Sequence, residues 1–199
     1  MIARKWGTTL LLVALLAGCR SSPPAHFFVL DPIPAQQRAT VASGTLVQVA
    51  AVNIPASLDR QEMVRESATG SLQISDTHRW GAPLGDMAQN VLTRDLIERL
   101  PAGAVLPPRT NAPQNTYEIT VDLLQFGADA AGKVVLDGGW SLYRLGSDTP
   151  VMNRQVELNE PTAAPDYSSQ VQAMSRLLGR MADDIAGSLR AISATTHQR

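Results

Sequence analysis

Apolar and polar residues follow one another with two spacings along this chain, and these spacings predict its secondary structure. Short apolar runs bounded by Pro, Gly and Asp predict strands; in the first half they cover residues 26–30, 45–54, 63–66 and 71–75. Segment 45–54 has no charge and is rich in Val and Leu, so we expect it to be buried on both faces. Ala68, Thr69 and Gly70 join the last two runs, which predicts a hairpin.

Two longer segments carry the 3.6-residue spacing of amphipathic helices. The first begins at Pro83, ends at Pro101, and has an apolar stripe made by Leu84, Met87, Ala88, Val91, Leu92, Leu96 and Leu100. The second runs from about Ser168 to Ile192, with a stripe made by Val171, Met174, Leu178, Met181, Ile185, Leu189 and Ile192. Asp166 or Ser168 is expected to cap its start. This stripe predicts packing on the protein's own sheet, with a seam for another subunit as the alternative.

Between the two helices the apolar spacing returns to two. A Pro-rich loop comes first, and then residues 116–126, 133–145 and 151–158 predict an antiparallel meander with short turns such as 127–132. Gly138 and Gly139 inside the middle strand indicate a bulge or a close backbone approach. The pattern predicts one α/β domain over residues 26–199: a mostly antiparallel mixed sheet of six or seven strands packed by two main helices. The tail after about residue 193 is expected to fray.

The first apolar run of the chain has the layout of a secretory signal. Arg4 and Lys5 precede an uncharged stretch that is shorter than the roughly 20 apolar residues of a membrane-spanning helix. The run ends in Leu16-Ala17-Gly18-Cys19, which matches the bacterial lipobox. The alternatives are an ordinary signal peptide followed by a chance cysteine, or a buried free thiol.

The lipobox match predicts how the N-terminus is processed. Residues 1–18 are expected to be a lipoprotein signal peptide, cut between Gly18 and Cys19, and Cys19 is expected to carry a diacylglycerol and an N-acyl chain. Two or more acyl chains hold a protein stably on a membrane. Residues 19–25 are the acylated cysteine and a short tether, and its residues 20–25 reach only about 20 Å, so the folded body should lie close to its membrane.

Arg20 stands where an Asp commonly retains lipoproteins in the inner membrane. By resemblance to sorted lipoproteins, this favours the periplasmic face of the outer membrane over that of the inner membrane. Cleavage removes Arg4 and Lys5 and takes the net charge from −1 to −3, leaving Lys133 as the sole lysine. A mildly acidic protein without a basic cluster is not expected to bind nucleic acid.

No pattern of catalytic or metal-binding residues stands out in the sequence. The three histidines, His26, His78 and His197, lack metal-ligand spacing, and His78 is expected in a loop. The only cysteine, Cys19, is expected to be consumed by lipid, and it has no partner for a disulfide within the chain. We therefore expect no enzyme activity, no metal, and no cofactor besides the covalent lipid.

Two groups of acidic residues invite a catalytic interpretation, but both have a structural alternative. Asp59, Glu62 and Glu66 lie among Arg60 and Arg65, so a solvated, salt-paired hairpin is the prediction. Asp183 and Asp184 are expected to form a polar helix face.

Three local patterns together resemble one family. They are the segment from Val49 to Arg60 followed by Met63-Val64, the segment Arg79-Trp80-Gly81-Ala82-Pro83-Leu84, and the order of lipobox, tether, first strand Phe27-Phe28-Val29-Leu30 and long last helix. This combination is similar to the PqiC/YmbA-type lipoproteins, also described as ABC-type transport auxiliary lipoprotein components. The resemblance covers essentially the whole mature chain, although Gly81-Ala82 stands where many relatives carry Ala-Glu.

The resemblance implies a function that the residues alone do not. It implies a non-enzymatic accessory of an MCE-type, ABC-linked lipid transport system, which docks the end of the transport tunnel at the outer membrane. The family is also associated with homo-oligomeric rings. The alternatives are a lipoprotein that binds a lipid or small apolar ligand, and a structural lipoprotein of the envelope.

The sequence also offers candidates for the contact with a partner or a second subunit. Arg79 and Trp80 combine a guanidinium with an indole, a common composition at interfaces. The hairpin that starts with Leu58, Asp59 and Arg60 is expected to border the same surface. The alternative for Trp80 is that it closes the core between sheet and helices, and Trp140, in mid-strand, is expected in the core.

Overall fold

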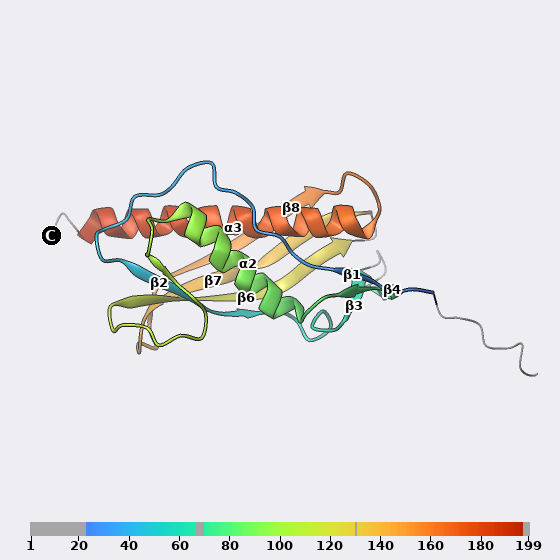
Figure 1. Ribbon diagram of the computed structural model, residues 1–199, viewed down its shortest axis with the longest axis horizontal. Helices are drawn as coiled ribbons and strands as arrows, with labels where there is room; N and C mark the ends of the chain where they lie inside the picture. Colours follow the sequence, from blue (N-terminus) through green and yellow to red (C-terminus); the bar gives the residue numbers. More distant parts are fainter. Residues whose placement is uncertain (1–22, 67–69, 130, 197–199) are drawn as a thin grey trace, which may run out of the picture.

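The computed structural model describes residues 23–66, 70–129 and 131–196, which form one mixed sheet with two helices across the same face (Figure 1). The strands are β1 (His26–Phe28), β2 (Leu46–Asn53), β3 (Glu62–Glu66), β4 (Leu72–Trp80), β5 (Val105–Leu106), β6 (Thr116–Asp129), β7 (Lys133–Arg144) and β8 (Pro150–Pro161). The helices are α2 (Leu84–Arg99) and α3 (Tyr167–Thr196). The predicted fold class is therefore confirmed, with eight strands instead of six or seven.

Strand β6 is the centre of the sheet, and its two edges are used differently. One edge pairs with β7 along its length, and β7 pairs with β8, which gives the predicted antiparallel meander. The other edge is shared by two parallel partners: β2 pairs with residues 116–122, and β3 pairs with Ala128 and Asp129. Residues 123–127 of β6 lie between these two ladders, and the connection from β2 to β3 passes beside them.

Several elements differ from the prediction in number or extent. The Pro-rich loop contains β5, whose two residues pair with Val47 and Gln48 of β2 and are too few to show a pattern in the sequence. Strand β4 continues to Trp80 because β1 pairs in parallel with its last residues. His78 therefore lies in a strand, not in a loop, and its ring stacks 4.2 Å from that of Tyr167. Strand β6 runs on to Asp129, into the predicted turn.

The apolar stripes of both helices face the sheet. The stripe of α3 is buried in the protein's own core, as the first of the two interpretations predicts, and Trp140 is also in the core. Asp166 caps α3 by accepting a hydrogen bond from the N–H of Ser169 at 2.7 Å. The helix continues to Thr196, beyond the residue where fraying was expected.

The predicted close approach at Gly138 is present. The register between β6 and β7 shifts between Leu123 and Gln125, opposite Gly138. A Cβ atom on Gly138 would lie 2.3 Å from the carbonyl oxygen of Asp122, so no larger residue fits there without moving the backbone.

Asp183 and Asp184 lie on the polar side of α3, as predicted, but each also binds a partner outside the helix. Asp183 accepts a 2.6 Å hydrogen bond from Nε of Arg99, a buried residue of α2. Asp184 accepts one of 2.9 Å from the indole N–H of Trp140 and pairs with Arg154 at 3.2 Å. Both carboxylates thus connect α3 to other elements, because the buried side chains of Arg99 and Trp140 reach them from the core.

Residues 30–39 cross both helices as an extended strap. The N–H of Asp31 donates to Oγ of Ser175, and the N–H of Ile33 donates to Oδ1 of Asp95 at 2.6 Å. Arg99 donates to the carbonyl of Ile33 at 3.0 Å. The segment that follows β1 is thereby fixed to α2 and α3.

Candidate docking site

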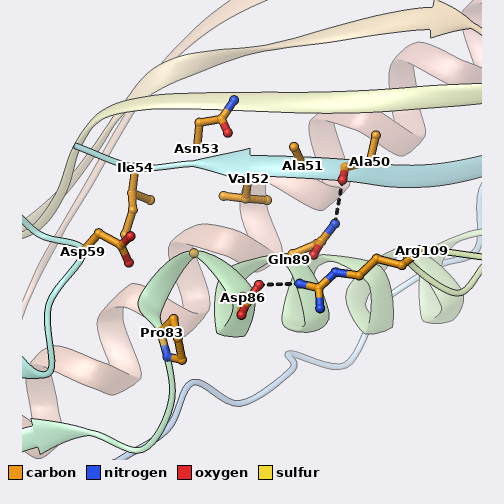
Figure 2. A pocket seen from close by; sticks show the side chains of 11 residues that line it. Ala50, Ala51, Val52, Asn53, Ile54, Asp59, Pro83, Asp86, Gln89 and Arg109 are labelled. Atoms are coloured by element: carbon orange, nitrogen blue, oxygen red, sulfur yellow. Dashed lines mark hydrogen bonds and ion pairs between the residues drawn. The ribbon is translucent and has the colours of Figure 1, made fainter. Parts of the chain in front are cut away.

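The connection between β2 and β3, residues 54–61, lies between two hollows of the surface. The first hollow, called here the polar cleft, lies between the end of β2 and the start of α2 (Figure 2). The second, called the apolar hollow, lies over residues 124–128 of β6, a stretch in which β2 does not pair and β3 pairs only with Ala128. The first two sequence patterns of the family resemblance meet at this connection.

The polar cleft has a volume of about 400 Å³ and is lined by Ala50, Ala51, Val52, Asn53, Ile54, Asp59, Pro83, Gly85, Asp86, Gln89 and Arg109. Pro83 is the N-cap residue of α2 and directly precedes its first helical residue, Leu84. Gly85 lets the first turn approach β2 closely, since a Cβ atom there would lie 3.1 Å from the carbonyl oxygen of Val52.

A buried amide fixes the two walls of the polar cleft to each other. Nε2 of Gln89 donates to the carbonyl oxygens of Val49 at 3.0 Å and Ala50 at 2.8 Å. The register of β2 shifts between Val49 and Ala51, and Gln89 satisfies carbonyls at that irregularity. Specific hydrogen bonds therefore hold α2 against β2 at this side of the cleft.

The rim of the polar cleft carries charge. Asp86 and Arg109 form an ion pair across it, and Asp59 stands at its end (Figure 2). Two carboxylates against one guanidinium leave the cleft slightly negative. Among the described residues, no group of three or more His, Cys, Asp or Glu side chains is arranged to hold a metal.

The apolar hollow has a volume of about 220 Å³ and is lined by Pro55, Ser57, Leu58, Val64, Glu66, Leu72, Leu124, Gln125, Gly127 and Ala128. Leu124 is 71 % exposed and Leu72 is 41 % exposed, although both are large aliphatic residues. Ile74, which is also exposed, lies beside them because it pairs with Val64. The result is an apolar patch on the face of the sheet that the helices do not cover.

The structure brings three of the predicted contact residues together on the β2–β3 connection. Leu58 is half-buried in the apolar hollow, and Asp59 borders the polar cleft. Arg60 forms a 2.9 Å ion pair with Glu62, which lowers the pKa of the Glu62 carboxyl. This pair is the salt-paired hairpin that the sequence predicts.

The remaining acidic and basic residues of the hairpin have other partners than those expected. Arg65 donates to Oε1 of Gln170 at 2.9 Å and lies over the ring of Tyr167. Glu66 accepts a 3.2 Å hydrogen bond from Gln125.

Arg79 and Trp80 are the last two residues of β4, and they differ in burial. Arg79 is half-buried and faces Glu62 across the β3–β4 ladder. Trp80 is 3 % exposed and packs in the core, so its indole offers no surface to a partner. Of the two predictions for Trp80, the structure therefore confirms the one that places it in the core.

Sequence reasoning did not find Leu72, Leu124 or the ion pair of Asp86 with Arg109. Leu124 did leave a signal, because two consecutive leucines interrupt the alternation of apolar and polar residues along β6. The register shift between Leu123 and Gln125 turns the second leucine outward. Gly18 and Cys19, the predicted processing site, lie outside the described residues.

A model of the family described as ABC-type transport auxiliary lipoprotein component matches residues 28–186, from the end of β1 to the greater part of α3. The chain belongs to this family. Among the described residues, we find no helix that combines the length and the apolar character needed to cross a membrane.

Two curated relatives of this auxiliary lipoprotein carry the name "Intermembrane transport lipoprotein PqiC". The one from Escherichia coli (strain K12) is 24 % identical over 189 residues, which cover 94 % of this chain and 98 % of the relative. The relative from Shigella flexneri matches to the same extent.

Two crystal structures have a similar fold. One, of an uncharacterized protein, has a TM-score of 0.71 and 18 % identity over 84 % of this chain and 99 % of its own. The other, of a protein from Xanthomonas campestris, has a TM-score of 0.64 and 17 % identity over 87 % of this chain and all of its own. At these identities the similarity shows that the auxiliary lipoprotein shares a fold with both.

Proposed function

We propose that this protein is a membrane-anchored, periplasmic accessory of an intermembrane lipid transport system. In this proposal, residues 1–18 are removed, Cys19 carries the lipid, residues 19–25 are the tether, and residues 26–199 form the docking domain. The domain, as a homo-oligomeric ring, receives the end of an MCE-type tunnel protein at the outer membrane. It acts by binding and positioning, without catalysis.

The family and the names of the relatives support the transport part of this proposal. The family is described as an auxiliary lipoprotein component of ABC-type transport, the relatives are named intermembrane transport lipoproteins, and they span nearly the whole chain. The lipobox Leu16-Ala17-Gly18-Cys19 supports the anchor, and Arg20 after the cysteine supports the outer membrane.

The observation that carries the docking role is the apolar hollow. Exposed aliphatic residues gathered in a concave patch and rimmed by polar groups are typical of protein–protein contact sites. Leu58, Leu72 and Leu124 form such a patch, with Glu66 and Gln125 at its rim. We assign the hollow to an apolar side chain of the tunnel protein.

The polar cleft supports the same docking role through electrostatic interactions. Charged groups at the rim of an interface contribute to specificity and association rate more than to affinity. Asp59 and Asp86 lie on one side of the β2–β3 connection, and the leucines lie on the other. A partner that seats an apolar residue in the hollow would meet these carboxylates with its own basic residues.

The test replaces the apolar surface without touching the core. The variant Leu72→Asn with Leu124→Asn should lose recovery of the MCE-type protein when the acylated lipoprotein is purified from envelope membranes. The matched control is Ile97→Asn, which removes an exposed aliphatic side chain from α2. Mass spectrometry identifies the partner, and thermal unfolding confirms that both variants are folded. Equal recovery with the double variant and the control would refute the docking role of the hollow.

A further inference from the structure

Strand β1 presents two large apolar side chains to the outside of the protein. Phe27 is 64 % exposed, and Val29, directly after the strand, is 54 % exposed. The residues between and after them, Phe28 and Leu30, pack in or against the core. Since side chains alternate along extended backbone, Phe27 and Val29 point to the same side. The two side chains therefore form one exposed apolar face.

The two residues belong neither to the core nor to the docking site. The apolar hollow and the polar cleft are formed by other residues, none of them from β1. β1 lies at the outer edge of the sheet, where it pairs only with the last residues of β4. Phe27 stands opposite Arg79 in that ladder, and Arg79 itself is half-buried.

The chain before β1 limits what this face can meet. His26 follows the expected lipid attachment at Cys19 by seven residues, which span at most about 25 Å when fully extended. Helix α3, with its 30 residues, is about 45 Å long. β1 lies towards one end of the long axis and the C-terminal end of α3 at the other (Figure 1). With so short a tether, the β1 end of the protein must face the membrane.

We infer that Phe27 and Val29 contact the lipid surface to which Cys19 is attached. This inference rests on the anchor in the proposed function, and it adds the face of the domain that lies on the lipid. An exposed Phe beside an exposed Val suits the interfacial region of a phospholipid leaflet, where both side chains can lie among the acyl chains. The contact sets the orientation of the domain, because a lipid anchor alone leaves rotation free.

Single-cysteine labelling tests the contact in the intact lipoprotein. The mature chain has no cysteine besides Cys19, whose sulfur is expected to be blocked by lipid, so Phe27→Cys and Val29→Cys each give one reactive thiol. Each variant is labelled with the polarity-sensitive dye NBD and reconstituted into phosphatidylethanolamine/phosphatidylglycerol vesicles. Val151→Cys is the control, since Val151 is also an exposed apolar residue, at 45 %, but lies at the other end of the sheet.

We expect NBD at positions 27 and 29 to gain about twofold in emission on reconstitution, to shift to the blue, and to be quenched by spin-labelled lipids. NBD at position 151 should stay solvent-like. A blue shift without quenching by spin-labelled lipids would show that a second copy or another protein covers this face, and it would overturn the inference. Solvent-like emission at both positions would overturn it as well, provided that the same variants also stay solvent-like when they are attached to the vesicle without acylation.

A second arm separates the lipid contact from native acylation. The same variants are prepared with Cys19 replaced by a hexahistidine tag and are attached to vesicles that contain a nickel-chelating lipid. Quenching in this arm but not with the native protein would keep the contact and reject acylation at Cys19. Loss of quenching in both arms would reject the contact while leaving the docking role of the apolar hollow to its own test.

Discussion

Asp95 is a carboxyl group with no exposed surface, and only part of its hydrogen-bonding capacity is used. Oδ1 accepts the N–H of Ile33, whereas Oδ2 has no hydrogen-bond partner among the described residues. Nη1 of Arg99 is 3.8 Å from Oδ1, at the limit of an ion pair. Burial raises the pKa of Asp95 from 3.8 to about 6, although the bond from Ile33 and the charge of Arg99 act in the opposite direction.

The raised pKa predicts how stability depends on pH. Between pH 4 and pH 6, Asp95 holds a proton in the folded state that it has released in the unfolded state, so its contribution to stability falls as pH rises through this window. Asp95→Asn keeps an acceptor for Ile33 and removes the buried charge. We expect a flatter pH profile of the unfolding free energy and a gain of about 1 kcal/mol or more above pH 7. Urea unfolding from pH 4 to pH 8 measures the unfolding free energy of the original protein and of the variant. If the unfolding free energy of Asp95→Asn depended on pH as steeply as that of the original protein, the raised pKa of Asp95 would be contradicted.

Asp183 should matter far more than its exposed position suggests. It is the carboxylate partner that Arg99 reaches at 2.6 Å, and the Arg99 side chain is buried. Removing one member of a buried pair leaves the other charge without compensation. Because Asp183 itself is solvated, we expect Asp183→Ala to cost about 1–3 kcal/mol, less than a fully buried pair would.

Arg180→Ala, on the exposed side of the same helix, is the matched control and should change the unfolding free energy by less than about 0.5 kcal/mol. Chemical denaturation of both variants at pH 7 makes the comparison. Equal effects would mean that Arg99 finds sufficient compensation from backbone carbonyls alone.

At the scale of elements, the approach of β7 to β6 at Gly138 is the most demanding contact. We expect Gly138→Ala to destabilise the protein by about 3 kcal/mol or more, because the new Cβ atom would overlap the backbone of Asp122. Gly127→Ala is the control in the same pair of strands, since its Cβ atom would meet only the carbonyl of Val64 at 3.9 Å. Thermal unfolding of the two variants should differ clearly, and similar melting temperatures would contradict this account of the bulge.

The elements that follow a regular spacing could be predicted from the sequence, and those that depend on a neighbour could not. Both helices and the meander follow local patterns that survive in the fold. β5 and the second half of β4 are strands only because β2 and β1 supply partners, so polar residues such as Thr77 and His78 gave no sign of them. The ion pair of Asp183 could not be predicted for a similar reason: its partner, Arg99, is far away in the sequence.

For the whole molecule, the position of the candidate docking site was beyond sequence reasoning. The β2–β3 connection could be proposed as a contact surface from Leu58, Asp59 and Arg60. Leu72 and Leu124, however, join it only through the arrangement of β3, β4 and β6. Parallel pairings between distant strands leave no local pattern, and here they decide where the hollow lies.

The short tether predicts that the docking surface is held at a fixed height above the membrane. Inserting about 20 Gly and Ser residues after Ala25 should keep the anchor but let the domain move away from the lipid. We expect photo-crosslinking from position 124 to the tunnel protein in intact cells to fall severalfold. The same insert placed after Arg199 should leave the yield unchanged, and equal yields for both inserts would show that height is unimportant.

The shared edge of β6 has a consequence for how such a protein can change. Its two ladders, with β2 and with β3, build a rigid frame with one opening, and residues 54–61 bridge that opening. Lengthening or shortening this bridge would resize the opening while every rung of the sheet stays in place. The scaffold can therefore acquire a new partner preference through one surface segment, without a new core.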